Sequence, residues 1–290
     1  MKKFAFLYII IAGVLWSTSG IFVHLLSPFG FSSLQMTFFR GLVSFLLIMV
    51  YLPIYKKKLL KVRAKELFLF AASGIALFGT ASCYYASMQA TSISTAEILM
   101  YTAPILVMIY SVVFLGEKLT KPKAVSVLCM LIGCGLVSGI IGGLKFNFWG
   151  IVLGFLSGIL YSAYNILTKI EMRRGSNPIS ATLYCFLFVT VVSFFVCNPA
   201  ELVSLVAQKP MVTLPLILGL GVCTCILPYF LYTLALKELP AGTASALGII
   251  EPMSATVFSV LLFHEPLGLS SICGIVLILG AVFILSRSED

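Results

Sequence analysis

The chain has 290 residues, of which 60% are hydrophobic and 10% are charged, and its formal net charge is +9. A soluble domain carries roughly 25% charged residues, so this chain cannot cover a folded surface with polar side chains. The positive charge does not indicate nucleic-acid binding, because no soluble basic segment with interleaved aromatic residues occurs. The composition therefore predicts a polytopic membrane protein whose surroundings are a lipid bilayer.

Apolar segments long enough to cross about 30 Å of hydrocarbon as helices recur along the chain. The first continues through Leu26 without a cleavage site of the signal-peptide type, so we expect a membrane helix there. The expected fold class is an all-α polytopic membrane protein with ten transmembrane helices. Charge, glycine and proline place these helices at residues 5–26, 33–53, 66–88, 93–115, 121–140, 149–169, 178–197, 212–236, 241–263 and 269–286.

Basic residues gather on alternate connections between these helices. The segment 56–65 (KKKLLKVRAK) is the strongest case, whereas Lys145 and Lys209 are the basic residues expected on the opposite connections. Cytoplasmic loops are enriched in lysine and arginine, so both termini are expected in the cytoplasm. The sequence predicts a multi-pass protein of the cell inner (plasma) membrane with an even number of spans.

Two prolines and two glutamates repeat at the same spacing. Pro104 precedes Glu117 by thirteen residues, and Pro252 precedes Glu265 by thirteen residues. We therefore expect two homologous five-helix repeats, at residues 1–142 and 143–290. Five is odd, so the second repeat has inverted topology, which is typical of transporters with a site at the repeat interface. A shift of 148 residues relates both pairs, and it also aligns Tyr84 with Tyr232, Thr95 with Thr243 and Ser111 with Ser259.

Each of these prolines is expected to break the fourth helix of its repeat. Proline removes a backbone hydrogen bond from a helix interior. In a membrane protein the neighbouring helices can satisfy the freed backbone groups. Pro104 and Pro252 therefore mark two helix breaks in matching positions.

The sequence resembles EamA-type members of the drug/metabolite transporter superfamily over its whole length. The resemblance rests on the stretches APILVMIYSVVFLGEKLTKPKAVSVLCMLIGCGLV and EPMSATVFSVLLFHEPLGLSSICGIVLILGAVFIL, with TFFRG and GVLWS earlier in the chain. The HEP of the second stretch departs from the usual GE and leaves Gly116 without a counterpart. The resemblance implies a ten-helix exporter or importer of small metabolites that works by alternating access, with helices 5 and 10 peripheral. It implies no particular substrate.

Glu251 is the candidate for the centre of a substrate site. It lies ten residues into the ninth predicted helix, about 15 Å deep and near the bilayer midplane. An ionisable group at that depth is costly and indicates a binding or pathway role. The alternative is a protonated carboxyl group bonded to backbone that Pro252 loosens.

Aromatic side chains are predicted to surround this carboxyl group. Trp16 and Tyr84 of the first repeat and Tyr161 and Tyr232 of the second are the candidates, with Asn165 beside them. Aromatic rings around a carboxylate are the arrangement that holds an ammonium group, whereas ordinary aromatic packing is the alternative. We therefore expect a secondary transporter of an amine-bearing metabolite, either an amino acid or an organic cation. A neutral substrate such as a nucleobase is the second possibility.

Enzymes, cofactors and metals are not expected. Phosphate-transferring membrane enzymes use clustered aspartates to hold Mg²⁺, yet Asp290 is the only aspartate, and no Gly-x-Ser-x-Gly occurs. The eight cysteines fall inside apolar segments and form no C-x-x-C pair, so they are expected to pack as small hydrophobic residues.

Other polar residues suggest contacts between the predicted helices. Arg40 and Glu97 both descend from the outer surface, so we expect them to form an ion pair that is either structural or active in gating and coupling. Glu117 and Glu265 are expected to accept backbone N–H groups at the start of the helix that follows each of them. The G-x-x-x-G spacing of Gly135, Gly139 and Gly143 is compatible with a homodimer.

Overall fold

The computed structural model describes residues 2–91, 93–138, 147–264 and 268–288, and these are helical apart from turns and connections. The α-helices are α1 (Lys2–Ser17), α2 (Ser19–Leu26), α3 (Ser33–Tyr55), α4 (Ala64–Ala90), α5 (Ile93–Met100), α6 (Ala103–Phe114), α7 (Lys121–Val137), α8 (Phe148–Arg173), α9 (Pro178–Val196), α10 (Pro199–Gln208), α11 (Pro210–Gly221), α12 (Leu227–Ala235), α13 (Ala241–Leu247), α14 (Ile250–Phe263) and α15 (Leu269–Ser288). Short 3-10 turns lie at Ser27–Phe29 (η1) and Lys57–Leu60 (η2), and a π turn (η4) joins α11 to α12 at Val222–Ile226.

Within the described ranges, nine continuous or interrupted helices are long and apolar enough to cross a membrane. Their outer faces carry large apolar side chains, of which Phe195 is 82% exposed and Phe68 is 74% exposed. Such surfaces are stable in lipid, so the protein is a multi-pass membrane protein. The fifth predicted helix corresponds to α7, which has 17 residues and stops just before residues 139–146, outside the described part. The count of ten spans thus stays a prediction.

The fourth helix of each predicted repeat consists of two shorter helices. A turn at Tyr101–Thr102 separates α5 from α6, and a turn at Gly248–Ile249 separates α13 from α14. Pro104 and Pro252 lie in the first turn of α6 and of α14, where a proline costs no helical hydrogen bond. The helix breaks therefore precede the prolines and leave two helix N-termini inside the molecule.

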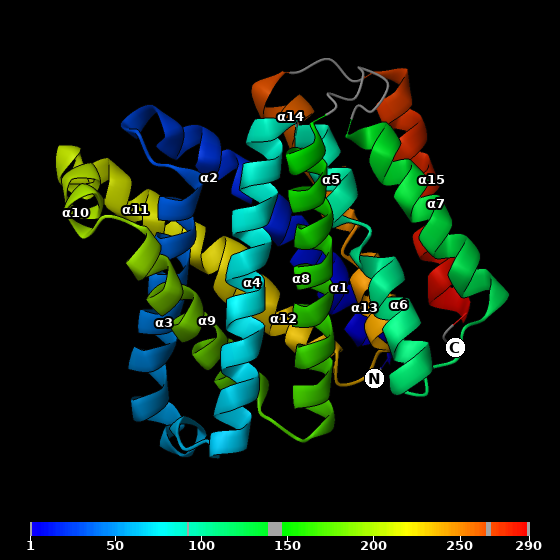
Figure 1. The fold of residues 1–290 in the computed structure, drawn as a ribbon, viewed down its shortest axis with the longest axis horizontal. Coiled ribbons are helices and arrows are strands. Elements are labelled where there is room, and N and C mark those ends of the chain that lie inside the picture. Colours follow the sequence, from blue (N-terminus) through cyan, green and yellow to red (C-terminus); the bar gives the residue numbers. More distant parts are fainter. Residues whose placement is uncertain (1, 92, 139–146, 265–267, 289–290) are drawn as a thin grey trace.

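The segment before α11 contains a helix that the sequence analysis missed. Residues 199–208 form α10, whose start is capped by the Asn198 side chain, which accepts from the N–H of Ala200 at 3.1 Å. Gln35 Nε2 of α3 donates to Glu201 Oε2 of α10 at 3.2 Å. Figure 1 shows α10 at the end of the molecule opposite to the start of α1 and the end of α15. The Asn-Pro-Ala-Glu start is an N-terminal helix signal that an apolar-segment search passes over.

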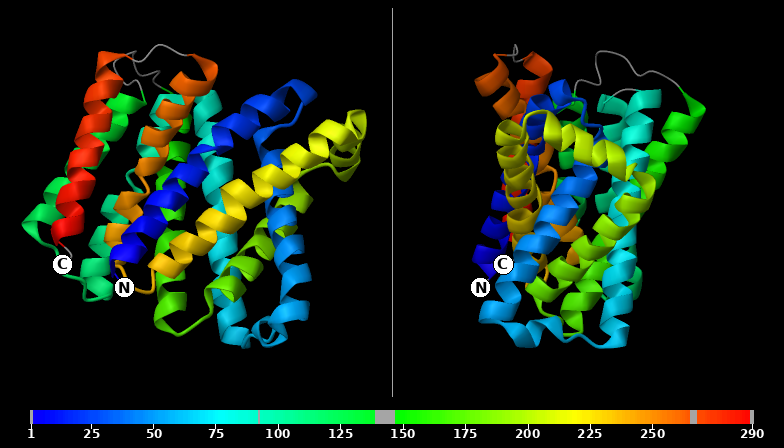
Figure 2. Two further views of the ribbon diagram at one scale, coloured as in Figure 1. Left: turned by 180° about the vertical axis from the view of Figure 1, so that it is seen from behind. Right: turned by 90° about the vertical axis from the view of Figure 1, so that its left-hand side faces the viewer.

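Many helix contacts join one half of the chain to the other, and they come in equivalent pairs. α4 packs against α8 as α12 packs against α1, and α6 packs against α8 as α14 packs against α1. α3 also contacts α9, and α7 contacts α15. Figure 1 shows that each of these last two pairs runs antiparallel, and Figure 2 shows α1–α2 and α11–α12 running diagonally side by side. Helices of one half therefore pack mainly against helices of the other half.

Two glycines let helices approach the two helix breaks closely. A Cβ on Gly158 of α8 would lie 2.8 Å from the carbonyl oxygen of Leu99, beside the α5–α6 break. A Cβ on Gly13 of α1 would lie 3.1 Å from Ile250 Cβ, beside the α13–α14 break. Near the start of each half a shift of 145 residues aligns Gly13 with Gly158, so each half packs a glycine against the helix break of the other half.

Gly158→Ala is expected to destabilise the protein. Its methyl group would meet the backbone of α5 and must push two helices apart, which costs about 1–3 kcal/mol in a packed interior. Thermal unfolding of the detergent-purified variant should show a lower midpoint than the wild type. The matched control is Gly280→Ala on α15, where a Cβ would meet no heavy atom within 4 Å. Equal midpoints for the two variants would contradict the close packing at Gly158.

The glycines of α7 have an intramolecular role. A Cβ on Gly133 would lie 2.9 Å from the carbonyl oxygen of Gly274, because α7 crosses α15 at this point. Gly135 is buried in the same helix. Gly139 and Gly143 lie outside the described residues, so the homodimer stays a prediction.

Candidate functional site

A cavity of about 300 Å³ lies between the two halves. Helices from both halves contribute to its walls, and both helix breaks reach it. Its polar and aromatic lining includes two carboxylates, one arginine, one threonine and several aromatic rings. These residues are Trp16, Arg40, Tyr84, Tyr85, Glu97, Tyr101, Tyr161, Thr224, Tyr229 and Glu251.

Glu251 is placed in this cavity by the α13–α14 break. It lies in the first turn of α14, where the positive end of the helix dipole favours a carboxylate. The hydroxyl group of Tyr101 donates to Glu251 Oε2 at 3.0 Å. Tyr101 itself lies in the α5–α6 break, so the two breaks bring together residues 150 positions apart. The result is an acceptor that is held in place and faces a space of substrate size.

The predicted aromatic wall is present in part. Trp16, Tyr84 and Tyr161 line the cavity. Tyr232 does not: it is fully buried behind Trp16, with ring centroids 5.4 Å apart, and its hydroxyl donates to Asn165 Oδ1. Asn165 is fully buried as well. The expectation that Tyr232 and Asn165 face the substrate is therefore corrected, because they pair with each other and Tyr232 packs against the ring of Trp16.

Three cavity tyrosines were missed by the sequence analysis: Tyr85, Tyr101 and Tyr229. Tyr229 packs edge-on against Trp16, with ring centroids 5.1 Å apart. The repeat shift aligns Tyr101 with Ile249, so a search for matching aromatics cannot find it. The available signal was the position of Tyr101 three residues before Pro104, within a predicted helix break.

Arg40 and Glu97 both line the cavity, but the predicted ion pair between them is not formed. Among the described residues, the ion pairs within 4.0 Å are Arg63–Glu66 and Arg173–Glu117. Glu97 Oε2 instead accepts a hydrogen bond from Ser138 Oγ at 2.8 Å. Both side chains line the same cavity, so both can face a ligand. Their role in gating or coupling stays a prediction.

The cavity opens at one end of the molecule. A wider space of about 850 Å³ shares Gly20, Tyr84, Glu97 and Glu251 with it. This space continues between α2 and α14 to Pro28, in the turn that follows α2. Figure 1 shows the end of α2 opposite to the start of α1 and the end of α15. The site is therefore reached from the end that does not carry the termini.

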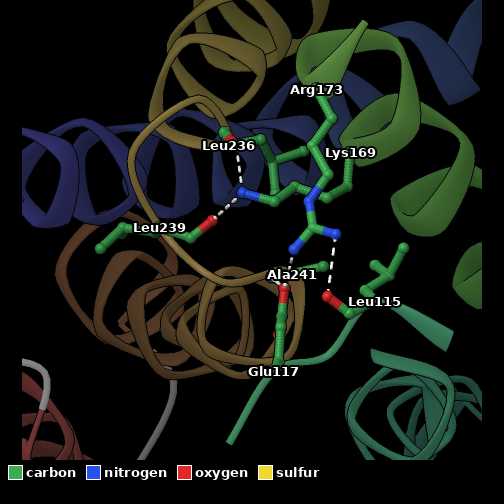
Figure 3. A network of polar contacts seen from close by, with 7 residues as sticks. All are labelled: Leu115, Glu117, Lys169, Arg173, Leu236, Leu239 and Ala241. Atoms are coloured by element: carbon green, nitrogen blue, oxygen red, sulfur yellow. Dashed lines mark hydrogen bonds and ion pairs between the residues drawn. The ribbon is translucent and has the colours of Figure 1, made fainter. Parts of the chain in front are cut away.

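The other end is closed by a set of polar contacts, here called the closing network (Figure 3). Lys169 Nζ of α8 donates to the carbonyl oxygens of Leu236 and Leu239, at 2.7 and 2.5 Å. Arg173 Nη1 of α8 donates to the carbonyl oxygen of Leu115 at 2.9 Å. These bonds join α8 to the chain after α6 and to the connection between α12 and α13. They lie at the termini end and hold the two fourth helices against α8.

Glu117 belongs to the same network and not to a cap on the following helix. Its Oε1 accepts from the backbone N–H of Ala241, the first residue of α13, at 2.9 Å, and lies 3.9 Å from Arg173 Nη2. The sequence analysis placed this contact at the start of α7, and the structure moves it to a helix of the other half. The related Glu265 lies outside the described residues.

Comparison with known proteins agrees with this architecture. The chain is 28% identical over 281 residues to an uncharacterized transporter of Archaeoglobus fulgidus, covering 96% of this chain and 95% of that protein. An uncharacterized transporter of Clostridium kluyveri is 28% identical over 310 residues, covering 100% of this chain and 95% of the relative. A solved crystal structure superposes with a TM-score of 0.79 at 17% identity, covering 98% of both chains, and shows the likeness of fold alone.

A family model matches the chain twice in succession, at residues 3–139 and 148–287. The two matches flank the segment between α7 and α8, and each covers the helices of one half. The match, the membrane-spanning helices and the cavity between the halves agree with one another. The chain belongs to the EamA-like transporter family.

Proposed function

We propose that the protein is a secondary transporter that moves a small amine-bearing metabolite across the cytoplasmic membrane by alternating access. The observation that carries the proposal is the cavity between the halves, open at one end and closed at the other by the closing network. A site accessible from one end at a time is what alternating access requires.

Ten spans with both termini in the cytoplasm complete the proposed topology. The antiparallel pairs α3–α9 and α7–α15 support an inverted relation between the repeats. The basic segment around η2 and the residues Arg173 and Arg174 lie at the end that carries the start of α1. That end is cytoplasmic by the positive-inside rule. The cavity accordingly opens to the outside in this conformation.

The cavity chemistry favours a substrate with an ammonium group. Glu251 provides a carboxylate, and the rings of Trp16 and Tyr161 lie in the same cavity. Arg40 lines this cavity too and is in none of the ion pairs among the described residues. A zwitterion would place its ammonium group at Glu251 and its carboxylate at Arg40. An amino acid is therefore the substrate class that the cavity fits best.

Uptake by proteoliposomes containing the purified protein tests the proposal. Labelled amino acids, organic amines, nucleobases and a sugar phosphate are offered one at a time, with protein-free liposomes as the control. We expect saturable uptake of at least one amino acid or amine and exchange against the same unlabelled compound. Uptake of a nucleobase alone would overturn the amine assignment, and uptake of nothing in a broad panel would overturn transport.

Tyr161→Ala is expected to weaken binding of the cationic substrate. Removing one ring beside an ammonium group costs about 0.5–2 kcal/mol, which corresponds to roughly 2- to 30-fold in dissociation constant. Tyr161→Phe keeps the ring and is the matched control. Binding is measured by calorimetry on the purified variants. Equal losses for both variants would assign the effect to the hydroxyl group and contradict a role for the ring.

A further inference from the structure

A second, much smaller polar pocket lies near the termini end, between α4, α8, α9 and α12. Its volume is about 10 Å³, the space of a single water molecule or a bare small cation. Glu171 of α8 lines it and is 1% exposed. Glu171 Oε1 is buried and accepts no hydrogen bond from the described residues. An uncompensated carboxylate in such a place is costly.

Three of the hydroxyl groups that line the pocket donate to backbone carbonyl groups of their own helices. Ser73 Oγ donates to the carbonyl oxygen of Phe70 at 3.0 Å. Thr168 Oγ1 donates to that of Tyr164 at 2.8 Å, and Thr182 Oγ1 to that of Pro178 at 2.9 Å. A hydroxyl has one proton and two lone pairs, so these three groups offer the pocket acceptors. Ser73, Thr168 and Thr182 line it together with Glu171.

The pocket contains no compensating positive charge among the residues that line it. Its other titratable members are Tyr164 of the same helix, Cys185 of α9 and Tyr229 of α12. Lys169, two residues before Glu171, directs its ammonium group to the Leu236 and Leu239 carbonyl oxygens of the closing network. The pocket thus presents a carboxylate and neutral oxygens to a space of one small ion.

We propose that the Glu171 pocket binds one small monovalent cation, a proton or Na⁺, while the termini end is closed. Hydroxyl and carboxylate oxygens are ligands for hard cations and acceptors for a protonated carboxyl group alike. Opening the termini end separates α8 from α12 and releases the ion to the cytoplasm. The use of this ion in coupling rests on the transport function proposed above, whereas the binding itself does not.

Tyr229 connects this pocket to the main cavity. It lines both spaces, and its ring contacts Trp16 on one side and Phe186 on the other, each with centroids 5.1 Å apart. An ion at Glu171 and a substrate in the main cavity therefore lie on either side of Tyr229. The two occupants can favour the same arrangement of α8 and α12 without meeting.

Thermal unfolding of the purified, substrate-free protein tests the site. One arm varies Na⁺ at fixed pH, with K⁺ keeping the ionic strength constant, and the other varies pH in K⁺ alone. The variants are Glu171→Gln, Thr168→Val, which keeps the shape and removes an oxygen, and Glu238→Gln as the control for loss of an exposed cytoplasmic-side carboxylate. The wild type should gain stability with Na⁺ or with falling pH.

Glu171→Gln is expected to remove this gain in stability, and Glu238→Gln is expected to keep it. Thr168→Val should raise the cation concentration at half of the gain severalfold, because binding is weaker. A Na⁺ response identifies sodium, and a pH response that only Glu171→Gln removes identifies the proton. A wild type that responds to neither cation, or a Glu171→Gln variant that responds like the wild type, overturns the proposal. Transport could still take place in that case, so the two failures are distinguishable.

Discussion

Glu251→Gln is expected to remove the dependence of flux on the pH at the cavity mouth. The carboxyl group of Glu251 is the acceptor at the centre of the cavity, and glutamine keeps its shape and its contact with Tyr101 but cannot exchange a proton. Loss of a charge-assisted hydrogen bond costs about 1.5–3 kcal/mol, so binding of a cationic substrate should weaken roughly 10- to 100-fold. Flux into proteoliposomes is measured with the pH varied on the outer side.

Glu238→Gln is the control, because it removes an exposed carboxylate that does not line the cavity. This variant should keep the pH dependence. Unchanged pH-dependent flux in Glu251→Gln would leave that carboxyl group with a structural role beside Pro252. The transport function would survive that result, but the coupling mechanism would not.

The sequence predicted the scaffold well because hydrocarbon imposes simple rules on it. Apolar length locates the spans, and it needs no knowledge of tertiary contacts. The spacing of Pro104 and Pro252 located both helix breaks to within a few residues. It could not show that the breaks precede the prolines, since a proline is compatible with both a kink and a first helical turn.

The site was less predictable because it departs from the repeat symmetry. The search for aligned aromatics placed Tyr232 on the wall, where the structure instead pairs it with Asn165. It missed Tyr101, which aligns with Ile249, and Tyr229, which aligns with Ala81. Two halves that share a fold can differ at positions that line a cavity, because functional sites are where local sequence rules are expected to fail. Alignment finds the shared packing residues and passes over the others.

Contacts between helices that are far apart in the sequence could not be predicted from short sequence patterns. A glutamate before a helix commonly caps that helix, and this general rule assigned Glu117 to the start of α7. The structure bonds it to Ala241, because the packing of the two halves brings α13 against α6. Such a bond depends on the packing of the halves, and a single sequence does not encode that packing in any short motif.

Lys169→Met is expected to shift the protein toward the state that is open at the termini end. The Lys169 ammonium group donates to the carbonyl oxygens of Leu236 and Leu239, and methionine keeps the apolar stem without these donors. Hydrogen bonds to a charged group contribute about 1.5–3 kcal/mol each. The two carbonyl groups bond to water when the termini end opens. The loss of the Lys169 hydrogen bonds therefore destabilises the closed state and not the open one. The equilibrium should move roughly 10-fold or more.

Alkylation rates of single cysteines in a cysteine-free background measure this shift. Ser19→Cys reports the outer cavity, and Thr182→Cys reports the pocket near the termini end. In the Lys169→Met background, the rate at Ser19→Cys should fall and the rate at Thr182→Cys should rise. Arg174→Met is the matched control, since Arg174 is exposed, follows Arg173 in the chain and is not a partner in the bonds of the closing network. Rates that stay the same at both positions would mean that other contacts hold the termini end closed. A fall at Ser19→Cys alone would indicate collapse of the cavity, because alternating access requires that one end opens as the other closes.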